Sequence, residues 1–522
     1  MTVFQTPAVP AHCNARMARH RLARWGLRLA AVGLGMVGSA AAWAQMGIEP
    51  DTNPVQIKPA HARIGIERIR LPGDEGVGLL GTSYLIGLGD SGFYAGPAAY
   101  SAFTGRRGGL YTFGGEVAYA MPLGDRLRAE VGLYAGGGGG SAAPVGGGLM
   151  LRPHADLVWD LGGQSVGVSL SRVRFPNGAI DSTQLGLVWN IHSDFRYVAG
   201  DRLNAPAEAR GRPGVGFDRI QAVGGVYRPR PGVNRLSGSP MPANVGYVGV
   251  RAEQSWGRYG FWGVEANGAA TGGVGGYAEF LGTVGLERAI AERVHVGGRL
   301  ALGTGGGGDV DVGGGLLAKA SVYTALRISR QFAVALEGGY TRAPQGGFRA
   351  PHASASLIWI LDDAAAVTAP TEVVKTEFSV GTERYNAQRK DGTRRNLDAV
   401  VLKINRFVTP EFYLTGQAHS AYIGGAGAYS AGYFGVGWST PLGERVRVGA
   451  ELLAGAAAGG GVDTAGGAIV QPMAYLGVRV TPSMSLRVGA GHIRSLRGGL
   501  ASPVVDATLT YTYGLAGRTA PR

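Results

Sequence analysis

The sequence predicts an all-β protein, an antiparallel up-and-down transmembrane β-barrel built from three homologous eight-stranded repeats. Three observations predict this fold class. Apolar residues alternate with small or polar ones for about ten residues at a time, which is typical of strands with one apolar and one polar face. The alternating segments recur in three copies that align with one another. The chain also combines 92 glycines among 522 residues with only 16% charged residues.

The composition excludes two other classes of glycine-rich chain. Collagen requires glycine at every third residue, and no such period accompanies the glycines here. A disordered chain is poor in apolar residues, whereas hydrophobic residues make up 45% of this one. The glycines therefore belong to a folded protein.

Residues 1–44 are predicted to be a signal peptide. Several arginines precede an uncharged stretch from Leu29 to Ala44, and the small residues Ala42 and Ala44 mark a cleavage site. The stretch is too short and too rich in Gly and Ala for a stable membrane helix. The one cysteine, Cys13, lies in this segment, so the mature chain is expected to hold no disulfide and no Cys-ligated metal. We expect no cofactor and no metal site.

Aligned landmarks define the three repeats. Arg126 is separated from Arg293 by 167 positions, as Leu149 is from Leu316, and a shift of 152 leads on to the third copy. The predicted organisation after the signal peptide is an N-terminal extension (45–60), repeat 1 (61–191), a linker (192–217), repeat 2 (218–361), a linker (362–375), repeat 3 (376–513) and a C-terminal tail (514–522).

Each repeat contains alternating segments. Between Tyr111 and Met121 the odd positions are mostly apolar or aromatic, and the even positions are small or, at Glu116, charged. In repeat 3 the breaks are clearest and predict eight strands: Thr376–Tyr385, Leu397–Val408, Phe412–Gly424, Gly432–Pro441, Val446–Ala456, Ala468–Val480, Ser483–His492 and Val504–Tyr513. Their connections alternate between long and tight, as in an up-and-down barrel with short periplasmic turns.

The two strand faces distinguish a bilayer barrel from a soluble sandwich. A sandwich would expose many Lys, Glu and Thr residues to water, whereas here the polar face is mostly Gly, Ala and Ser with sparse charges of both signs. Tyr and Trp residues stand near strand ends, where an interfacial girdle is expected. These are Tyr119, Trp159, Trp189, Trp359, Tyr511 and Tyr513.

A signal peptide, a cysteine-free mature chain and the final alternating segment Thr508–Tyr513 together resemble the bacterial outer-membrane β-barrel proteins. The resemblance is to the class and covers nearly all of the mature chain. It implies export to the cell outer membrane, with outer-membrane lipids, lipopolysaccharide and the barrel-assembly machinery as partners. One departure is that residues 514–522 extend beyond Tyr513, whereas members of the class commonly end on an aromatic residue.

Eight strands per repeat permit two architectures. Eight strands close a small barrel, and three repeats in series would close one of about 24 strands. The long linkers favour separate barrels. The abundant inward Gly, Ala and Ser residues would fill a narrow lumen poorly unless long charged side chains cross it, and this tips the prediction toward one barrel of about 24 strands.

Basic residues recur at aligned inward positions and are candidates for lining a lumen. They are Arg128, His295 and Arg447 at the start of the fifth strand, and Arg152 and Lys319 at the start of the sixth. Rings of positive charge would favour anions. Pairing with inward carboxylates such as Glu130 or Glu337 is the alternative.

Arg174, Arg342 and Arg494 also align, but they fall on the apolar face at the loop end of the seventh strand. An outward arginine costs little near the membrane interface, where it can contact phosphate, so these three are candidates for lipopolysaccharide contact. Solvated rim charges are the alternative.

The sequence therefore predicts an outer-membrane channel or export pore with a mild preference for anionic solutes or polymers. A non-conducting structural or surface-interaction protein is the alternative. A lipid-modifying enzyme is disfavoured, because His154 and Asp156 share a face without a nucleophile motif. No nucleic-acid partner is expected, since no recognition motif accompanies the basic residues.

Overall fold

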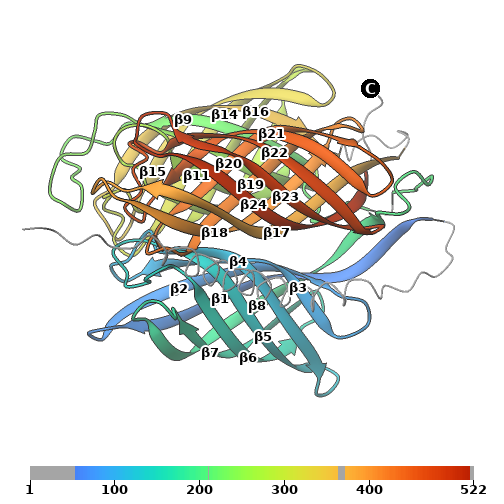
Figure 1. The fold of residues 1–522 in the computed structure, drawn as a ribbon, viewed down its shortest axis with the longest axis horizontal. Coiled ribbons are helices and arrows are strands. Elements are labelled where there is room, and N and C mark those ends of the chain that lie inside the picture. The colour runs from blue at the N-terminus through green and yellow to red at the C-terminus, as the bar shows by residue number, and fades with distance from the viewer. Residues whose placement is uncertain (1–52, 210, 363–370, 518–522) are drawn as a thin grey trace, which may run out of the picture.

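The computed structural model describes residues 53–209, 211–362 and 371–517, which form 24 β-strands (Figure 1). Within these ranges, no helix has the length and apolarity needed to cross a membrane. The predicted signal peptide and most of the C-terminal tail lie outside the described residues.

The strands form three barrels, which we number in chain order. Barrel 1 consists of β1 (Val55–Leu71), β2 (Glu75–Gly87), β3 (Phe93–Thr104), β4 (Tyr111–Pro122), β5 (Leu127–Gly139), β6 (Met150–Asp160), β7 (Gln164–Arg174) and β8 (Asp181–Ala199). Barrel 2 consists of β9 (Arg219–Tyr227), β10 (Val245–Trp256), β11 (Gly260–Ala269), β12 (Ala278–Ala289), β13 (Val294–Gly306), β14 (Leu316–Arg327), β15 (Phe332–Arg342) and β16 (Arg349–Ile360). Barrel 3 consists of β17 (Glu372–Gln388), β18 (Arg394–Phe407), β19 (Phe412–Ile423), β20 (Ser430–Pro441), β21 (Val446–Ala458), β22 (Ala468–Thr481), β23 (Met484–Ser495) and β24 (Ala501–Gly517).

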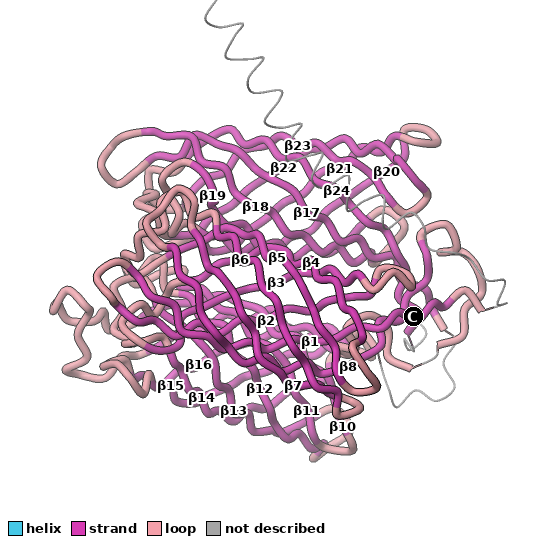
Figure 2. Tube along the Cα trace, turned by 90° about the horizontal axis from the view of Figure 1, so that it is seen from below, coloured by secondary structure: helices cyan, strands magenta, loops and turns pink. Residues whose placement is uncertain are grey.

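Each repeat closes on itself, because its first strand pairs with its last. β1 pairs with β8, β9 with β16, and β17 with β24, all antiparallel and over nine or more residues. Barrels 1 and 3 share only a short pairing of β8 with β24, in which Tyr513 lies opposite Ala199 and Gly514 opposite Val198. Figure 2 shows the result as three groups of tilted strands. The prediction of one barrel of about 24 strands is therefore wrong, and the alternative of three eight-stranded barrels describes the chain.

The strands extend somewhat beyond the expected repeat boundaries. β1 begins at Val55, within the expected N-terminal extension, and β8 runs to Ala199, within the expected first linker. β17 begins at Glu372 and β24 ends at Gly517, so repeat 3 is also longer at both ends. All eight strands expected in repeat 3 are present.

The three barrels contact one another in a closed ring at their long-loop ends. A Cβ on Gly315 of barrel 2 would lie 2.4 Å from the carbonyl oxygen of Ala102 in barrel 1. The aligned glycines repeat this approach: Gly467 of barrel 3 faces the carbonyl of Ala269 in barrel 2 at 2.4 Å, and Gly148 of barrel 1 faces that of Ala421 in barrel 3 at 2.4 Å. Each barrel thus offers the same two surfaces, one to each neighbour, which is a head-to-tail ring that closes after three units.

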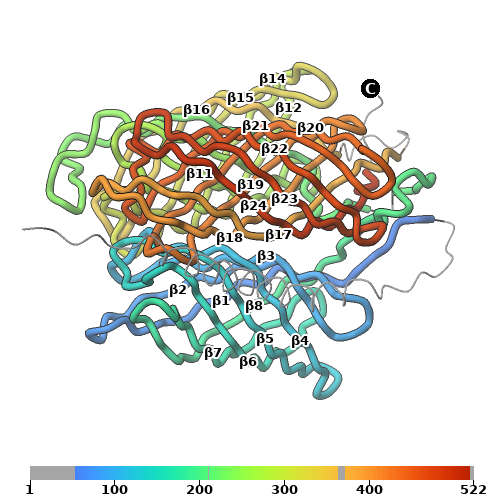
Figure 3. The backbone as a smooth tube through the Cα atoms, in the orientation of Figure 1, coloured from blue at the N-terminus to red at the C-terminus, as the bar shows by residue number. Residues whose placement is uncertain are grey.

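Hydrogen bonds between loops reinforce the ring at two of its three contacts. The amide of Gly108 in barrel 1 donates to the carbonyl of Gly313 in barrel 2 at 3.1 Å. The amide of Gly427 in barrel 3 donates to the carbonyl of Gly146 in barrel 1 at 3.2 Å. The chain runs through the ring once, from the blue barrel 1 through the green and yellow barrel 2 to the red barrel 3 (Figure 3).

At the opposite end, barrels 1 and 3 join through the extended strands β1, β8, β17 and β24. Phe195, Tyr197 and Tyr513 pack together there, with ring centroids 5.7 to 6.5 Å apart. Tyr513, expected in an interfacial girdle, is instead buried in this cluster at 7% exposure. Trp159 and Trp189 are exposed on the outer face, at 49% and 41%, as that girdle requires.

Candidate functional site: the filled lumens and the outer rim

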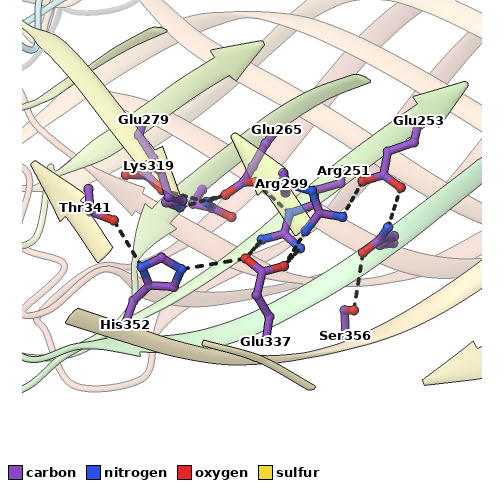
Figure 4. Close-up of polar contacts among 12 residues, drawn as sticks. Arg251, Glu253, Glu265, Glu279, Arg299, Lys319, Glu337, Thr341, His352 and Ser356 are labelled. Carbon is purple, nitrogen blue, oxygen red and sulfur yellow. Dashed lines mark hydrogen bonds and ion pairs between the residues drawn. The ribbon is translucent and has the colours of Figure 1, made fainter. Parts of the chain in front are cut away.

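Long charged side chains cross the lumen of barrel 2 (Figure 4). Arg251 on β10 reaches Glu265 on β11 through Nε at 2.6 Å and Glu337 on β15 through Nη1 at 2.7 Å. Arg299 on β13 reaches Glu253 at 2.6 Å and also contacts Glu337. Neither β15 nor β13 is a neighbour of β10 in the barrel, so the Arg251–Glu337 and Arg299–Glu253 pairs tie non-adjacent strands together across the lumen.

Lys319 on β14 completes the network of barrel 2. Its Nζ lies 2.8 Å from Glu265 and 2.7 Å from Glu279. Glu279 also accepts a hydrogen bond from the Tyr227 hydroxyl at 2.6 Å. At 3% exposure for Lys319 and 0% for Glu279, water reaches neither side chain. A buried charge is stable only when paired and hydrogen-bonded, and these groups satisfy that condition.

The lumen of barrel 1 is filled by a different set of pairs. Arg63 on β1 contacts Glu130 at 3.1 Å and also Asp156. Arg152 on β6 forms two hydrogen bonds to Glu67 on β1, both at 2.9 Å.

A histidine occupies the same interior. The Nδ1 of His154 lies 2.9 Å from Asp156, and its Nε2 lies 3.3 Å from Glu116. All three residues are buried, at 5% exposure or less. Both ring nitrogens therefore face carboxylates inside the barrel, away from any substrate in water.

The lumen of barrel 3 is also filled by paired charges, formed by other residues. Arg487 on β23 contacts Glu451 on β21 at 2.6 Å, and Lys403 on β18 contacts the same carboxylate at 3.7 Å. Elsewhere in the lumen, Gln471 donates to Glu383 at 2.6 Å.

Inward glycines make room for the large side chains that fill the lumens. A Cβ on Gly297 would lie 2.4 Å from the ring of Tyr323, and one on the aligned Gly449 would lie 2.3 Å from the ring of Tyr475. The small inward residues thus do not leave the lumen empty, because their neighbours occupy the space. This is the physical reason why eight strands suffice in each repeat.

The structure places all five expected lumen residues on the inner face. Arg152 and Lys319 are in the middle of the networks, each bound to carboxylates. Arg128 pairs with Glu130 at 2.7 Å and is partly exposed near the short-turn end. His295 lies 3.4 Å from Glu287, and Arg447 donates to the Ser439 hydroxyl at 3.0 Å.

The three expected lipid-contact arginines lie on the outer face at the long-loop end, and all are exposed. Arg174 faces Asp181 across β7 and β8, with 4.0 Å between the charged groups. Arg342 faces Arg349, and Arg494 faces Ala501. The aligned positions therefore have different surroundings in the three barrels.

Parity along the strands predicts which residues point inward, but it does not identify their partners. Arg63 and Asp156 are separated by 93 positions in the chain. Arg251, Arg299 and Arg349 were not among the expected site residues, although strand parity would have placed the first two in the lumen.

Comparisons with known proteins give similarities of low degree. No protein-family model matches the chain, and no curated protein matches it. The chain is similar to the solved structure of the ferric enterobactin receptor of Pseudomonas aeruginosa, with 8% identity and a TM-score of 0.29, covering 90% of this chain and 81% of the receptor. It is also similar to the outer membrane channel DcaP of Acinetobacter baumannii, with 12% identity and a TM-score of 0.21, covering 90% of this chain and 99% of DcaP.

A third similar structure is the outer membrane protein OpdK of Pseudomonas aeruginosa, with 9% identity and a TM-score of 0.23, covering 90% of this chain and all of OpdK. Two of these structures, DcaP and OpdK, are named as outer membrane proteins. At such identities and TM-scores, no ligand or transport activity carries over to this chain.

Proposed function

We propose that the protein is a bacterial outer-membrane protein whose three filled barrels form one rigid, non-conducting unit and whose loop end acts by surface interaction. The strands supply an outer face of exposed apolar residues, among them Leu170 at 53%, Leu185 at 73% and Val322 at 70%. Such a face is stable in hydrocarbon and unfavourable in water.

The single observation that carries the proposal is the burial of the ion-pair networks inside the lumens. Arg251 is 1% exposed, and Glu253 is 0% exposed. A water-filled channel would hydrate these groups. Instead, opposite charges are paired across each barrel, which fixes the walls relative to one another.

The pairing also weighs against anion preference in the lumen. In barrel 2, Arg251, Arg299 and Lys319 are matched by four carboxylates: Glu253, Glu265, Glu279 and Glu337. No positive excess is left to raise the local concentration of anions. The predicted channel with a mild preference for anions would therefore require the buried ion pairs of the lumen to separate.

Conductance across a planar lipid bilayer tests the proposal. We expect the purified protein, inserted from detergent and verified as folded by its heat-dependent gel mobility, to give no steady openings. Steady anion-selective openings would overturn the proposal and favour the channel. A purified chain that stays soluble without detergent would contradict the membrane location itself.

Catalysis is not part of this proposal. His154 is buried at 5% exposure, and its two ring nitrogens face Glu116 and Asp156. Replacement of His154 by Ala is expected to leave the lipids of cells that overproduce the protein unchanged, as judged by mass spectrometry against cells producing the unaltered chain.

A further inference from the structure

A pocket of about 300 Å³ opens at the long-loop end of barrel 2. Arg342 at the end of β15, Arg349 at the start of β16 and Arg235 in the loop between β9 and β10 contribute to its lining, together with Asp311. We call these four residues the rim pocket. Its lining thus contains three cationic side chains and one carboxylate.

Two of the cations are forced together by the strand register. Arg342 and Arg349 lie directly opposite each other across β15 and β16, and both are exposed on the outer face. Like charges at directly opposed positions destabilise a sheet. The pair is therefore costly unless a counter-charge lies between the two guanidinium groups.

The described residues supply no such counter-charge. Asp311 accepts backbone amides, from Gly347 at 2.8 Å and Gly313 at 3.3 Å, and forms no ion pair with the arginines. Arg235 donates to the carbonyl of Gly273 at 3.2 Å. The positive charge of the rim pocket is thus available to an external anion.

The other two barrels lack this arrangement at the aligned register. In barrel 1 the residue opposite Arg174 is Asp181, which also accepts two hydrogen bonds from Arg172, both at 2.7 Å. In barrel 3 the residue opposite Arg494 is Ala501. Barrel 1 therefore places a carboxylate opposite its rim arginine, whereas barrel 2 places a second arginine there.

We propose that the rim pocket binds phosphate groups, and that it takes them from a phosphorylated lipid of the outer leaflet such as lipopolysaccharide. The site rests on the proposed outer-membrane location and gives it a specific partner. A phosphate monoester carries close to two negative charges and three acceptor oxygens, which match the paired forks of two arginines. Binding would remove the repulsion between Arg342 and Arg349.

The test compares two double variants of the full-length protein in detergent. Arg342→Gln with Arg349→Gln removes the charges of the rim pocket. Arg172→Gln with Arg174→Gln removes the same number of charges from the loop end of β7 in barrel 1, where both arginines lie beside Asp181. Titration with fluorescent lipid A gives the dissociation constant of each protein, and heat-dependent gel mobility verifies its fold.

We expect the rim-pocket variant to bind lipid A at least about tenfold more weakly than the unaltered protein, because it loses charge-assisted hydrogen bonds. The barrel 1 variant should bind within about twofold, since exposed ion pairs contribute little. Should the double variant fail to fold, Arg349→Gln alone, which removes the facing charge, gives the same comparison.

Two results would overturn phosphate binding by the rim pocket, and a third would reject the lipid as its source. One is that the unaltered protein and the rim-pocket variant bind lipid A equally well. The other is that the unaltered protein binds lipid A equally well with and without its two phosphates. Full competition by millimolar inorganic phosphate would assign the pocket to free phosphate and reject the lipid as its source. None of these outcomes bears on conductance, so the proposed function stands or falls separately.

Discussion

At the scale of single residues, the filling of the lumens depends on charged side chains that are buried together with a partner of opposite charge. Lys319 lies between Glu265 and Glu279, and its own exposure is 3%. Removing one partner from a buried pair leaves the other charge unpaired in a medium of low dielectric constant. The cost of such a change is therefore larger than the net stability that the pair contributes.

This asymmetry predicts the effect of Lys319→Met, which keeps all but the last atom of the side chain's length and removes its charge. We expect the free energy of unfolding to fall by about 3 to 5 kcal/mol. Urea unfolding in detergent micelles, followed by tryptophan fluorescence, measures it. Arg494→Met, at an exposed position, is the control and should change stability by no more than about 0.5 kcal/mol. Equal midpoints for the two variants would contradict the paired-lumen account.

A second prediction at this scale follows from the same three residues. Adding Glu279→Gln to Lys319→Met removes the carboxylate that the single variant leaves without an ion pair, since Glu265 still pairs with Arg251. We expect the double variant to recover part of the lost stability, because a neutral amide costs less to bury than a charge. The same urea titration tests it, and a double variant less stable than the single one would refute it.

The alternation of the sequence predicts the inward direction of Arg152 and Lys319, and the structure places both in a lumen. It does not predict which carboxylate each one meets. Partners such as Arg152 and Glu67 lie 85 positions apart. Their meeting depends on the closure of the barrel and on the inward glycines that admit large side chains, neither of which is a local property.

At the scale of elements, the strand ends are the least predictable part. The expected first strand of repeat 3 begins at Thr376, whereas β17 begins at Glu372. At the end of β8, successive residues Tyr197 and Val198 are both buried, at 3% and 0%. Where both faces of a strand are covered, the period of two disappears from the sequence.

The glycines at the ring contacts give a prediction for these loops. Gly315 has a φ of +113°, and a Cβ there would lie 2.4 Å from the carbonyl oxygen of Ala102 in the next barrel. Gly315→Ala therefore strains the backbone and separates the two barrels, with an expected cost of about 2 kcal/mol. Gly124→Ala is the control, because a Cβ there meets no atom within 4 Å.

Thermal unfolding of the two variants in the same detergent measures the difference. The Gly315 variant should also be cleaved faster by protease in the loops between the barrels, since local separation exposes their backbone. A Gly315 variant that melts and resists cleavage like the Gly124 variant would mean that the close approach contributes nothing to the ring.

At the scale of the whole molecule, the sequence leaves the choice between one large barrel and three small ones open. The first and last strands of a repeat have the same alternating pattern as all others, so either could pair with its own repeat or with the next. The choice follows from how the lumen is filled. Tyr227, Arg251 and Lys319 span an eight-stranded interior, and they would leave a wider one empty.

Closure of each repeat on itself predicts that one repeat folds alone. Residues 218–361 contain β9 to β16, whose pairings are all internal to barrel 2, and the network around Arg251 and Lys319 is complete within them. We expect this fragment, refolded into detergent, to show the gel mobility shift of a closed barrel.

The fragment carries both surfaces of the ring contact, the carbonyl of Ala269 and the glycine at 315, so copies of it are expected to close a ring of three. Native mass spectrometry in detergent measures the number of copies, and the same fragment with Gly315→Ala should stay a monomer. A fragment that fails to fold would show that the barrels depend on one another. A folded monomer would show that the linkers, rather than the glycine contacts, hold the ring together.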